Sequence, residues 1–386
     1  MIAFLLAACL APWSATTGSA KSGRARAGEP IDVAFSTHDG HEMYGKLTLP
    51  GSGAPRAVVV YVQTAEGMTV DMRRPNGRGG TFDYFELYRT KLTEMRVGFF
   101  GYEGRGIHMG DSPPRYEAIE RELYDTSTLA NKVEDVLAAV RAVRAEAELA
   151  EVPVFLMGAS EGTLLAAQAA ARAPSEVQGL VLYGVMAQNL RETFTYILSD
   201  GAFLAYRGYF DADDDGKITK VEFEADPHRF RAKALGGGAF ELFDKDGDGL
   251  IGRADLVAQA KPLLDAVQQD NFALLDQWAK FAAGVSTPKD WFKDHFAQPP
   301  LWDFLAELDV PVGFFHGGLD TNTPIAGVEA LEAKASAAGK TRFLFEYFPQ
   351  AEHTLNIAAY FANGSLPDGH AAIFAYINEL AGERPR

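Results

Sequence analysis

The sequence predicts an α/β protein with a doubly wound, mostly parallel β-sheet. Several short runs are apolar on both faces, as expected of strands that are covered on either side. Longer segments with apolar residues three and four positions apart separate these runs, and this spacing is typical of amphipathic helices. Strand and helix patterns alternate along the chain, which favours parallel strands joined by helical crossovers.

The first part of the chain supplies a hairpin and four buried strands. Residues 31–36 and 43–49 alternate in polarity and flank Asp39-Gly40, a pair typical of a tight turn. Continuous apolar runs predict buried strands at residues 57–62, 97–102, 152–157 and 180–183. Helical spacing predicts helices at residues 82–95, 129–149 and 160–173.

The alternation stops between residues 187 and 300 and then resumes. Beyond the interruption we expect strands at residues 312–316 and 342–347 and helices at residues 326–338 and 370–380. The interrupting segment is rich in helical pattern, contains two acidic clusters and has little strand pattern. We therefore expect a helical cap, residues 187–300, inserted between two parts of one core, residues 31–186 and 301–386. Its aromatic residues either line a substrate cleft or pack the cap against the core: Trp278, Trp291, Phe292, Phe296 and the neighbouring Trp302.

The N-terminal 20 residues have the pattern of an export signal. Residues 1–13 are apolar, and Cys9 follows Leu6-Ala7-Ala8 as in a bacterial lipobox, where the thiol would be lipidated. Gly18-Ser19-Ala20 is an alternative cleavage site, and residues 21–30 have the composition of a linker. We therefore expect an exported bacterial protein that is periplasmic, secreted or tethered to the membrane as a lipoprotein. The single cysteine excludes an internal disulfide.

Charge and hydropathy argue against two broad classes of protein. The chain has 36 basic and 52 acidic residues, a formal net charge of −16 at pH 7. Nucleic-acid binding needs a concentrated basic surface, so we expect no nucleic-acid partner. Beyond the N-terminal run, no apolar stretch approaches the roughly 20 residues that span a bilayer.

A Gly-x-Ser-x-Gly pattern predicts a nucleophile at Ser160. The pattern runs from Gly158 to Gly162, between a predicted buried strand and a predicted helix. A sharp turn at such a junction leaves no room for side chains at the two glycines and presents the serine hydroxyl at the C-terminal edge of the sheet. A serine is a poor nucleophile at neutral pH, so a base and an orienting acid are required.

An aspartate and a histidine occur where those partners are expected. Asp320 follows the predicted strand 312–316, and His353 follows the predicted strand 342–347. In parallel-sheet hydrolases whose nucleophile lies on such a strand-to-helix turn, the three catalytic residues follow in the order serine, acid, histidine. Ser160, Asp320 and His353 have this order.

These motifs resemble the α/β-hydrolase family over residues 31–185 and 300–380. Besides the Ser160 turn, the resemblance rests on Tyr102-Glu-Gly-Arg-Gly106 to Gly110-Asp-Ser112, His316-Gly-Gly-Leu-Asp320 and Glu352-His353. It implies the α/β-hydrolase fold, with Ser160 as nucleophile, His353 as general base and then acid, and Asp320 as the group that orients the imidazole.

The expected oxyanion hole departs from the family pattern. Many relatives carry His-Gly after the strand that ends here at Val62, whereas this chain has Gln63-Thr64-Ala65-Glu66-Gly67. Backbone amides form an oxyanion hole, so the change does not remove it. The candidate donors are the amide of Glu161 and the amide of either Thr64 or Ala65.

Two acidic loops in the inserted segment resemble EF-hand calcium loops, residues 211–222 and 244–255. Such a loop offers oxygens from positions 1, 3, 5, 7, 9 and 12. The first loop offers side chains of Asp211, Asp213, Asp215, Thr219 and Glu222 and the carbonyl of Lys217. The second loop offers side chains of Asp244, Asp246, Asp248 and Asp255 and the carbonyl of Leu250.

We expect two Ca²⁺ sites, the second weaker than the first. Asp255 at position 12 has a shorter side chain than Glu222, and Gly252 at position 9 has none. Ile218 and Ile251 occupy position 8 of the two loops, where paired EF-hands meet by a short strand contact. The two loops are therefore expected to pair.

The sequence as a whole favours an extracytoplasmic serine hydrolase with a Ca²⁺-binding cap. A carboxylic-ester hydrolase that forms an acyl-enzyme is the leading interpretation, with a small-molecule ester or related acyl compound as substrate. Two alternatives stay open: a prolyl-type serine peptidase with the same triad, and a non-catalytic calcium-binding module on a hydrolase scaffold. A lipid at Cys9 would add a membrane anchor.

Overall fold

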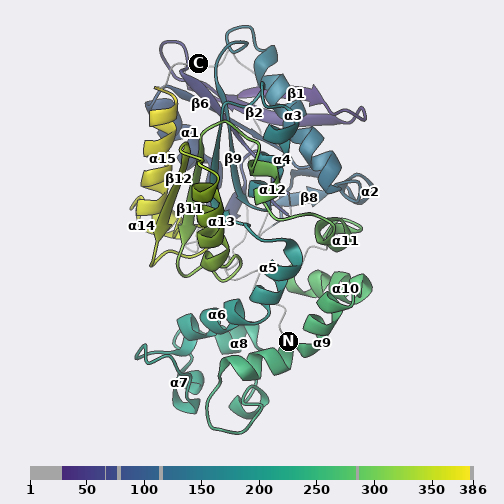
Figure 1. Ribbon diagram of the computed structural model, residues 1–386, viewed down its shortest axis with the longest axis vertical. Coiled ribbons are helices and arrows are strands. Elements are labelled where there is room, and N and C mark those ends of the chain that lie inside the picture. The colour runs from purple at the N-terminus through teal and green to yellow at the C-terminus, as the bar shows by residue number, and fades with distance from the viewer. Residues whose placement is uncertain (1–27, 66, 76–79, 113–115, 284–286, 383–386) are drawn as a thin grey trace.

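The computed structural model describes residues 28–65, 67–75, 80–112, 116–283 and 287–382 (Figure 1). Cys9, the export signal and most of the linker lie outside the described residues, so these stay predictions. Among the described helices, none combines the length and the apolar character that a membrane crossing requires.

An eight-stranded sheet forms the centre of the protein, in the order β1-β2-β6-β3-β9-β10-β11-β12. β1 pairs antiparallel with β2, and β2 pairs antiparallel with β6, whereas the other neighbours are parallel. The doubly wound, mostly parallel sheet is therefore as predicted. The strands are β1 (Ile31–Ser36), β2 (Glu42–Thr48), β3 (Ala57–Tyr61), β6 (Val97–Tyr102), β9 (Val154–Ser160), β10 (Gly179–Val185), β11 (Val312–Gly317) and β12 (Phe343–Phe348).

Helices and two small antiparallel sheets complete the core. The small sheets pair β4 (Arg73–Pro75) with β5 (Thr81–Asp83) and β7 (Ile107–Met109) with β8 (Glu117–Ile119). The helices of the core are α1 (Tyr84–Glu94), α2 (Arg121–Tyr124), α3 (Leu129–Ala145), α4 (Glu161–Arg172), α12 (Trp302–Leu305), α13 (Ile325–Ala337), α14 (Ala358–Asn363) and α15 (Asp368–Leu380).

Helices cover both faces of the sheet, which explains why its strands are apolar on both sides. Side chains alternate between the faces of a strand. Val58 and Val60 accordingly pack in the apolar cluster beneath α3 and α4, while Val59 and Tyr61 pack in a second cluster beneath α1 and α15. All four side chains are buried. Figure 1 shows the two helical layers on either side of the strands.

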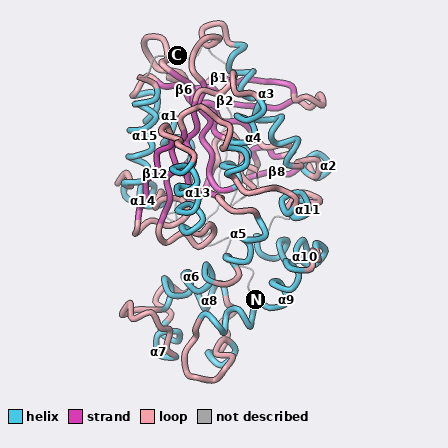
Figure 2. The backbone as a smooth tube through the Cα atoms, in the orientation of Figure 1, coloured by secondary structure: helices cyan, strands magenta, loops and turns pink. Residues whose placement is uncertain are grey.

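Residues between β10 and β11 form a helical region beyond one end of the sheet. Its elements are α5 (Leu190–Ile197), α6 (Asp200–Phe210), α7 (Lys220–Ala225), α8 (Phe230–Ala234), the 3₁₀ helix η1 (Phe240–Leu242), α9 (Arg253–Gln268), α10 (Phe272–Ala283) and α11 (Trp291–Phe296). In Figures 1 and 2, α6 to α9 form a lobe of helices and loops below the sheet. This lobe has an apolar cluster of its own, which includes Phe210, Phe223 and Phe243.

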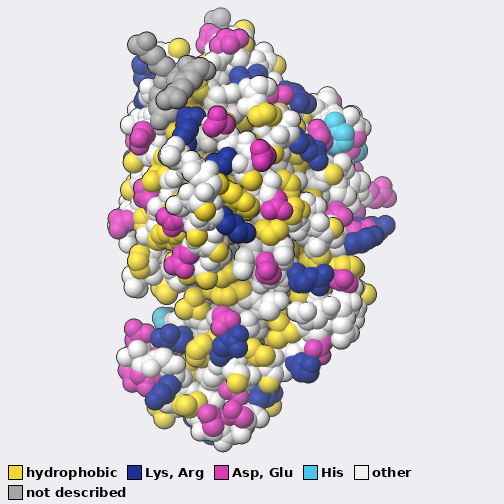
Figure 3. All heavy atoms as spheres, viewed as in Figure 1, with side chains coloured by type: hydrophobic (Ala, Val, Ile, Leu, Met, Phe, Trp, Pro, Cys, Tyr) yellow, Lys and Arg dark blue, Asp and Glu magenta, His cyan; other side chains and the backbone are white. Residues whose placement is uncertain are grey.

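Charged side chains of both signs are distributed over the visible face of the molecule (Figure 3). Lys and Arg are interspersed with Asp and Glu over the core, and the lower lobe carries groups of acidic side chains beside several basic ones. This distribution accords with the acidic composition of the chain.

Candidate active site

Ser160 lies in a strained turn between β9 and α4. Its backbone has φ 53° and ψ −124°, a region that residues with a Cβ rarely adopt. A Cβ at Gly158 would lie 2.2 Å from the Gly162 carbonyl oxygen, and a Cβ at Gly162 would lie 3.1 Å from the carbonyl oxygen of Gln63. The turn therefore requires glycine at Gly158, and it presents Ser160 where the C-terminal edge of the sheet meets the first turn of α4.

The structure brings Asp320 and His353 together. His353 Nδ1 lies 2.7 Å from Asp320 Oδ2, and Thr323 Oγ1 donates to the same oxygen at 2.7 Å. The amides of Asn322 and Thr323 donate to Asp320 Oδ1, each at 2.8 Å. Asp320 is 1% exposed, so these contacts replace the water that a carboxylate would otherwise bind. They fix the carboxylate so that the His353 ring is held through Nδ1.

His353 lies against the strand next to Ser160. Gly184 on β10 has φ 51°, and a Cβ there would lie 3.0 Å from His353 Cε1. The next residue, Val185, is the register partner of Ser160 on β9. The imidazole, on the loop after β12, thus lies against β10 next to the residue that pairs with Ser160, at the C-terminal edge of the sheet. Among the described residues, neither Ser160 Oγ nor His353 Nε2 makes a hydrogen bond, so both atoms are available for chemistry.

His316, a second buried histidine, braces this arrangement. Its Nδ1 accepts a hydrogen bond from the Val185 amide at 3.0 Å, so Nε2 carries the proton that faces the Thr323 carbonyl at 3.1 Å. Burial lowers the pKa of His316, which keeps the ring neutral. Both nitrogens are occupied by backbone groups, which leaves His353 as the histidine with a free nitrogen beside Ser160.

Charges around the pair set their protonation. Burial opposes ionisation of Asp320, but His353, His316 and the Thr323 hydroxyl together hold its pKa below the ordinary value. Burial also disfavours the charged form of His353, yet the Asp320 carboxylate outweighs it and raises the pKa of His353. Asp320 is therefore an anion that stabilises the protonated imidazole.

Gln63 and Lys132 organise the loop that carries Thr64 and Ala65. Gln63 Oε1 accepts from the Met68 amide at 2.6 Å, and its Nε2 donates to the Tyr102 carbonyl. Lys132 Nζ, on α3, lies 3.4 Å from the Thr64 carbonyl oxygen and 3.2 Å from the Ala65 carbonyl oxygen. Both carbonyls point to Lys132, and the amides of Thr64 and Ala65 have no hydrogen-bond acceptor among the described residues.

Glu161, the other predicted oxyanion donor, is the first residue of α4, where an amide has no acceptor within the helix. Its side chain enters a buried cluster that the sequence did not predict. Lys132 Nζ and Trp291 Nε1 each donate to the carboxylate at 2.8 Å, and His295 Nε2 lies 2.6 Å from it. Burial opposes ionisation of Glu161, but the charges of Lys132 and His295 lower its pKa to about 2.

The aromatic residues of the inserted region pack against the core. Trp291 and Phe292 are buried in the large apolar cluster beneath α3 and α4. Trp278, Phe296 and Trp302 are partly buried and pack against the same cluster. Of the two interpretations left open by the sequence, packing is the one that the structure supports.

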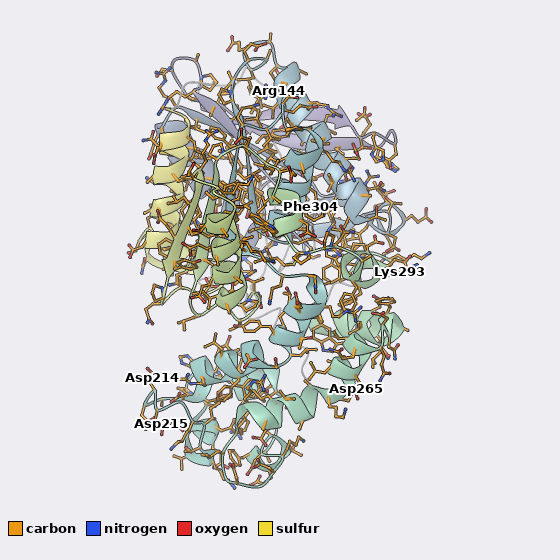
Figure 4. All side chains as sticks on the ribbon, viewed as in Figure 1. Arg144, Asp214, Asp215, Asp265, Lys293 and Phe304 are labelled. Carbon is orange, nitrogen blue, oxygen red and sulfur yellow. The ribbon has the colours of Figure 1, made fainter. Side chains whose placement is uncertain are left out.

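The acidic loops of the lower lobe each gather three carboxylates. Within each set the potential ligand atoms lie within 4.8 Å of one another; the sets are Asp211, Asp213 and Asp215, and Asp244, Asp246 and Asp255. Hard cations such as Ca²⁺ prefer oxygen ligands of this kind. Figure 4 shows Asp215, with its neighbour Asp214, on the loop between α6 and α7 at the edge of the lobe.

Other predicted ligands lie outside these sets. The Glu222 carboxylate accepts from the amides of Ala212 and Thr219, at 3.0 and 2.9 Å, and so caps α7. The Asp248 carboxylate accepts from the Leu250 amide at 2.9 Å, and the Lys217 amide donates to Asp215 at 2.8 Å. Full coordination of a cation would require the Glu222 carboxylate to turn toward the Asp211 set.

The two loops meet as their position-8 residues predict. The Ile251 amide donates to the Ile218 carbonyl at 2.9 Å, and Thr219 and Leu250 form an antiparallel bridge. Ile218 and Ile251 are fully buried in the apolar cluster of the lobe. Order in one loop is therefore mechanically connected to order in the other.

Comparisons with known proteins agree with this architecture. The family described as serine aminopeptidase, S33, matches residues 76–199, a stretch that contains the Ser160 turn. No curated protein matches the chain. An esterase of Pyrococcus furiosus is 12% identical with a TM-score of 0.50, over 95% of this chain and 96% of that one. A thermostable carboxyl esterase of Bacillus coagulans, solved with glycerol, is 14% identical with a TM-score of 0.52, over 91% of this chain and 99% of that one. The chain has the α/β-hydrolase fold.

Proposed function

We propose that this protein is a serine hydrolase that cleaves carboxylic esters through Ser160, His353 and Asp320. The observation that carries the proposal is the 2.7 Å contact between His353 Nδ1 and Asp320 Oδ2, with the ring against Gly184 beside the strained Ser160 turn. The family match across the turn and the esterases that share the fold support the same chemistry.

The residues would act in two steps. In acylation, Ser160 Oγ attacks the ester carbonyl carbon while His353 Nε2 takes the hydroxyl proton, and the alcohol then leaves with that proton. In deacylation, His353 removes a proton from water, the resulting hydroxide attacks the acyl-enzyme, and Ser160 regains its proton. Asp320 stays ionised throughout and stabilises the imidazolium. Backbone amides would bind the oxyanion in both steps.

A serine peptidase of the prolyl type is the second candidate, because the family that matches residues 76–199 is described as an aminopeptidase. Turnover of a p-nitrophenyl ester series and of a prolyl and aminoacyl p-nitroanilide series separates the two activities. We expect ester turnover that is lost in Ser160→Ala. Turnover of the anilides alone would establish the peptidase, and turnover of neither would indicate a non-catalytic scaffold.

We also propose that the lower lobe binds two Ca²⁺ ions, the second more weakly. The support is the gathering of three carboxylates in each loop and the contact between Ile218 and Ile251. Bound Ca²⁺ would neutralise these carboxylates and order the lobe. Calorimetric titration of Ca²⁺ into metal-free protein should give two binding events, of which Asp244→Asn removes the weaker.

The N-terminal segment is the basis of a proposal about export. We propose that the chain is processed either at Cys9, with lipidation of the thiol, or after Ala20, because both patterns are present in the sequence. Mass spectrometry of the mature N-terminus distinguishes these routes. An N-terminus that still begins at Met1 in exported protein would contradict both.

A further inference from the structure

We propose that Lys132 is a positioning residue. It orients the backbone amides of the oxyanion hole and, through Glu161, connects them to the inserted helical region. This inference rests on the proposed hydrolase function and concerns the same site. Lys132 lies on α3 and is 7% exposed. It contacts Glu161, the residue after the proposed nucleophile, which lies 29 positions further along the chain.

The Lys132 ammonium has three N–H groups, and it meets three acceptors. These are Glu161 Oε2 at 2.8 Å, the Ala65 carbonyl oxygen at 3.2 Å and the Thr64 carbonyl oxygen at 3.4 Å. The donors of the buried ammonium can therefore all be satisfied within the protein. Glu161 and the Thr64–Ala65 segment are the two parts of the chain expected to supply oxyanion donors, so one cation bridges both.

Peptide geometry converts these contacts into an orientation of the amides. In a trans peptide the carbonyl and the following N–H point in opposite directions. The Thr64 carbonyl faces Lys132 and also accepts from the Gly67 amide at 3.1 Å, so the Ala65 N–H is directed away from Lys132. Of the two amides considered from the sequence, Ala65 is the one whose peptide plane is held by two hydrogen bonds, both of them to the Thr64 carbonyl oxygen. We therefore assign Ala65 as the partner of the Glu161 amide.

The opposite side of Glu161 is held by the inserted region. Trp291 Nε1 donates to Glu161 Oε1 at 2.8 Å, and His295 Nε2 lies 2.6 Å from the same oxygen. His295 Nδ1 lies 2.9 Å from the Trp291 carbonyl oxygen, so an oxygen atom lies close to each ring nitrogen. Trp291 and His295 are on α11, whereas Lys132 and Glu161 are on core helices. The carboxylate thus joins α3, α4 and α11 at the base of the oxyanion hole.

Because Lys132 and Glu161 are buried charges, substitutions of the two residues test the proposed role of Lys132. Removing one member of a buried ion pair leaves an unpaired charge, whereas replacing both members with neutral residues of similar shape removes that penalty. Lys132→Met should therefore lower the melting temperature, and Lys132→Met combined with Glu161→Gln should recover much of it. The double variant still lacks a donor to the Thr64 and Ala65 carbonyls, so its oxyanion hole stays misaligned.

Activity and stability should consequently separate in the double variant. We expect kcat/KM for a p-nitrophenyl ester to fall roughly a hundredfold in Lys132→Met, mainly in kcat, and to stay low in the double variant. The pH at which kcat/KM is half-maximal should not move, because His353 and Asp320 keep their contacts. The matched control is Lys46→Met on β2, which breaks the 2.8 Å ion pair of Lys46 with Asp71 and should keep kcat/KM.

Two outcomes distinguish the failure of this inference from the failure of the proposed function. If a fluorophosphonate labels wild-type Ser160, and the double variant recovers kcat/KM together with its melting temperature, Lys132 is merely structural and the inference is overturned. If wild-type protein is neither labelled nor active, the proposed hydrolase function is wrong. The role of Lys132 in an oxyanion hole is then wrong as well. Recovered stability with low kcat in the double variant supports the assignment.

Discussion

Gly184 makes room for the ring of His353. A Cβ at Gly184 would lie 3.0 Å from His353 Cε1, 3.1 Å from Nδ1 and 2.6 Å from the His353 carbonyl oxygen. The Gly184 backbone also has φ 51°, which disfavours any residue with a side chain. A glycine in β10 is therefore needed to seat the proposed base beside Ser160.

Gly184→Ala should displace His353. We expect kcat/KM to fall at least tenfold, and the left-handed backbone alone should cost about 1 kcal/mol of unfolding free energy. Steady-state kinetics and thermal denaturation measure the two effects. Gly339→Ala is the control, because Gly339 has φ 69° but no atom within 4 Å of a Cβ. The control should lose similar stability and keep kcat/KM; equal activity in the two variants would show that His353 does not need this space.

The pH dependence of kcat/KM should report His353. Only the neutral imidazole can accept the Ser160 proton, and Asp320 raises the pKa of His353 above its usual 6.5. Activity should therefore rise with pH through a midpoint above 6.5. Asp320→Asn removes the anion, so the midpoint should move down while kcat falls by about 10⁴-fold. An unchanged midpoint in that variant would mean that another group controls the acid limb.

The hydrogen bond of Tyr196 connects the inserted region to the Asp320 loop. Tyr196 Oη, on α5, donates to the Asp320 carbonyl at 2.7 Å, and α6 begins three residues after α5 ends. Tyr196→Phe should cost about 1 kcal/mol of stability and lower kcat/KM, because the loop loses an anchor. Tyr44→Phe, which loses a 2.6 Å hydrogen bond to Asp32 near the far edge of the sheet, should leave kcat/KM unchanged. If kcat/KM is the same in the two variants, the Tyr196 hydrogen bond does not connect the inserted region to the active site.

Removal of Ca²⁺ should destabilise the lower lobe. Its apolar cluster is separate from those of the core, so its order depends on the loops that close it. A site with free Ca²⁺ at a hundred times its Kd gains about 2.7 kcal/mol, and EGTA should abolish this gain. Asp211→Asn should lose more of the Ca²⁺ response than Asp244→Asn. Asp265→Asn, a carboxylate on α9 outside both loops, is the control (Figure 4), and a melting temperature indifferent to EGTA would contradict the Ca²⁺ sites.

The sequence predicts most of the core because its signals there are local. Strands covered on both faces are continuous apolar runs, and the glycines at 158 and 162 mark a tight turn, in which a Cβ at Gly158 would clash with the backbone. Chain order and the ends of two predicted strands then select Asp320 and His353, which the structure places 2.7 Å apart. The pairing of the acidic loops is equally local, since Ile218 and Ile251 occupy equivalent positions.

The charged cluster beneath the proposed oxyanion hole could not be predicted in this way. Lys132, Glu161 and His295 lie on three helices. Lys132 is 29 positions before Glu161 in the chain, and His295 is 134 positions after it. Their proximity follows from the packing of α11 onto the core, which has no periodic signal. The sequence contains one indication of the cluster, the charged Glu161 directly after Ser160. This position begins α4 and is buried, so its carboxylate needs partners.

Intact-mass spectrometry after reaction with a fluorophosphonate tests the central claim most directly. One phosphonyl group should add to wild-type protein, peptide mapping should place it on Ser160, and Ser160→Ala protein should remain unmodified. Asp320→Asn should react far more slowly, since its imidazole is no longer stabilised as a cation. Wild-type protein that folds and stays unmodified, or Ser160→Ala protein that is modified equally fast, would contradict the assignment of Ser160 as an activated nucleophile.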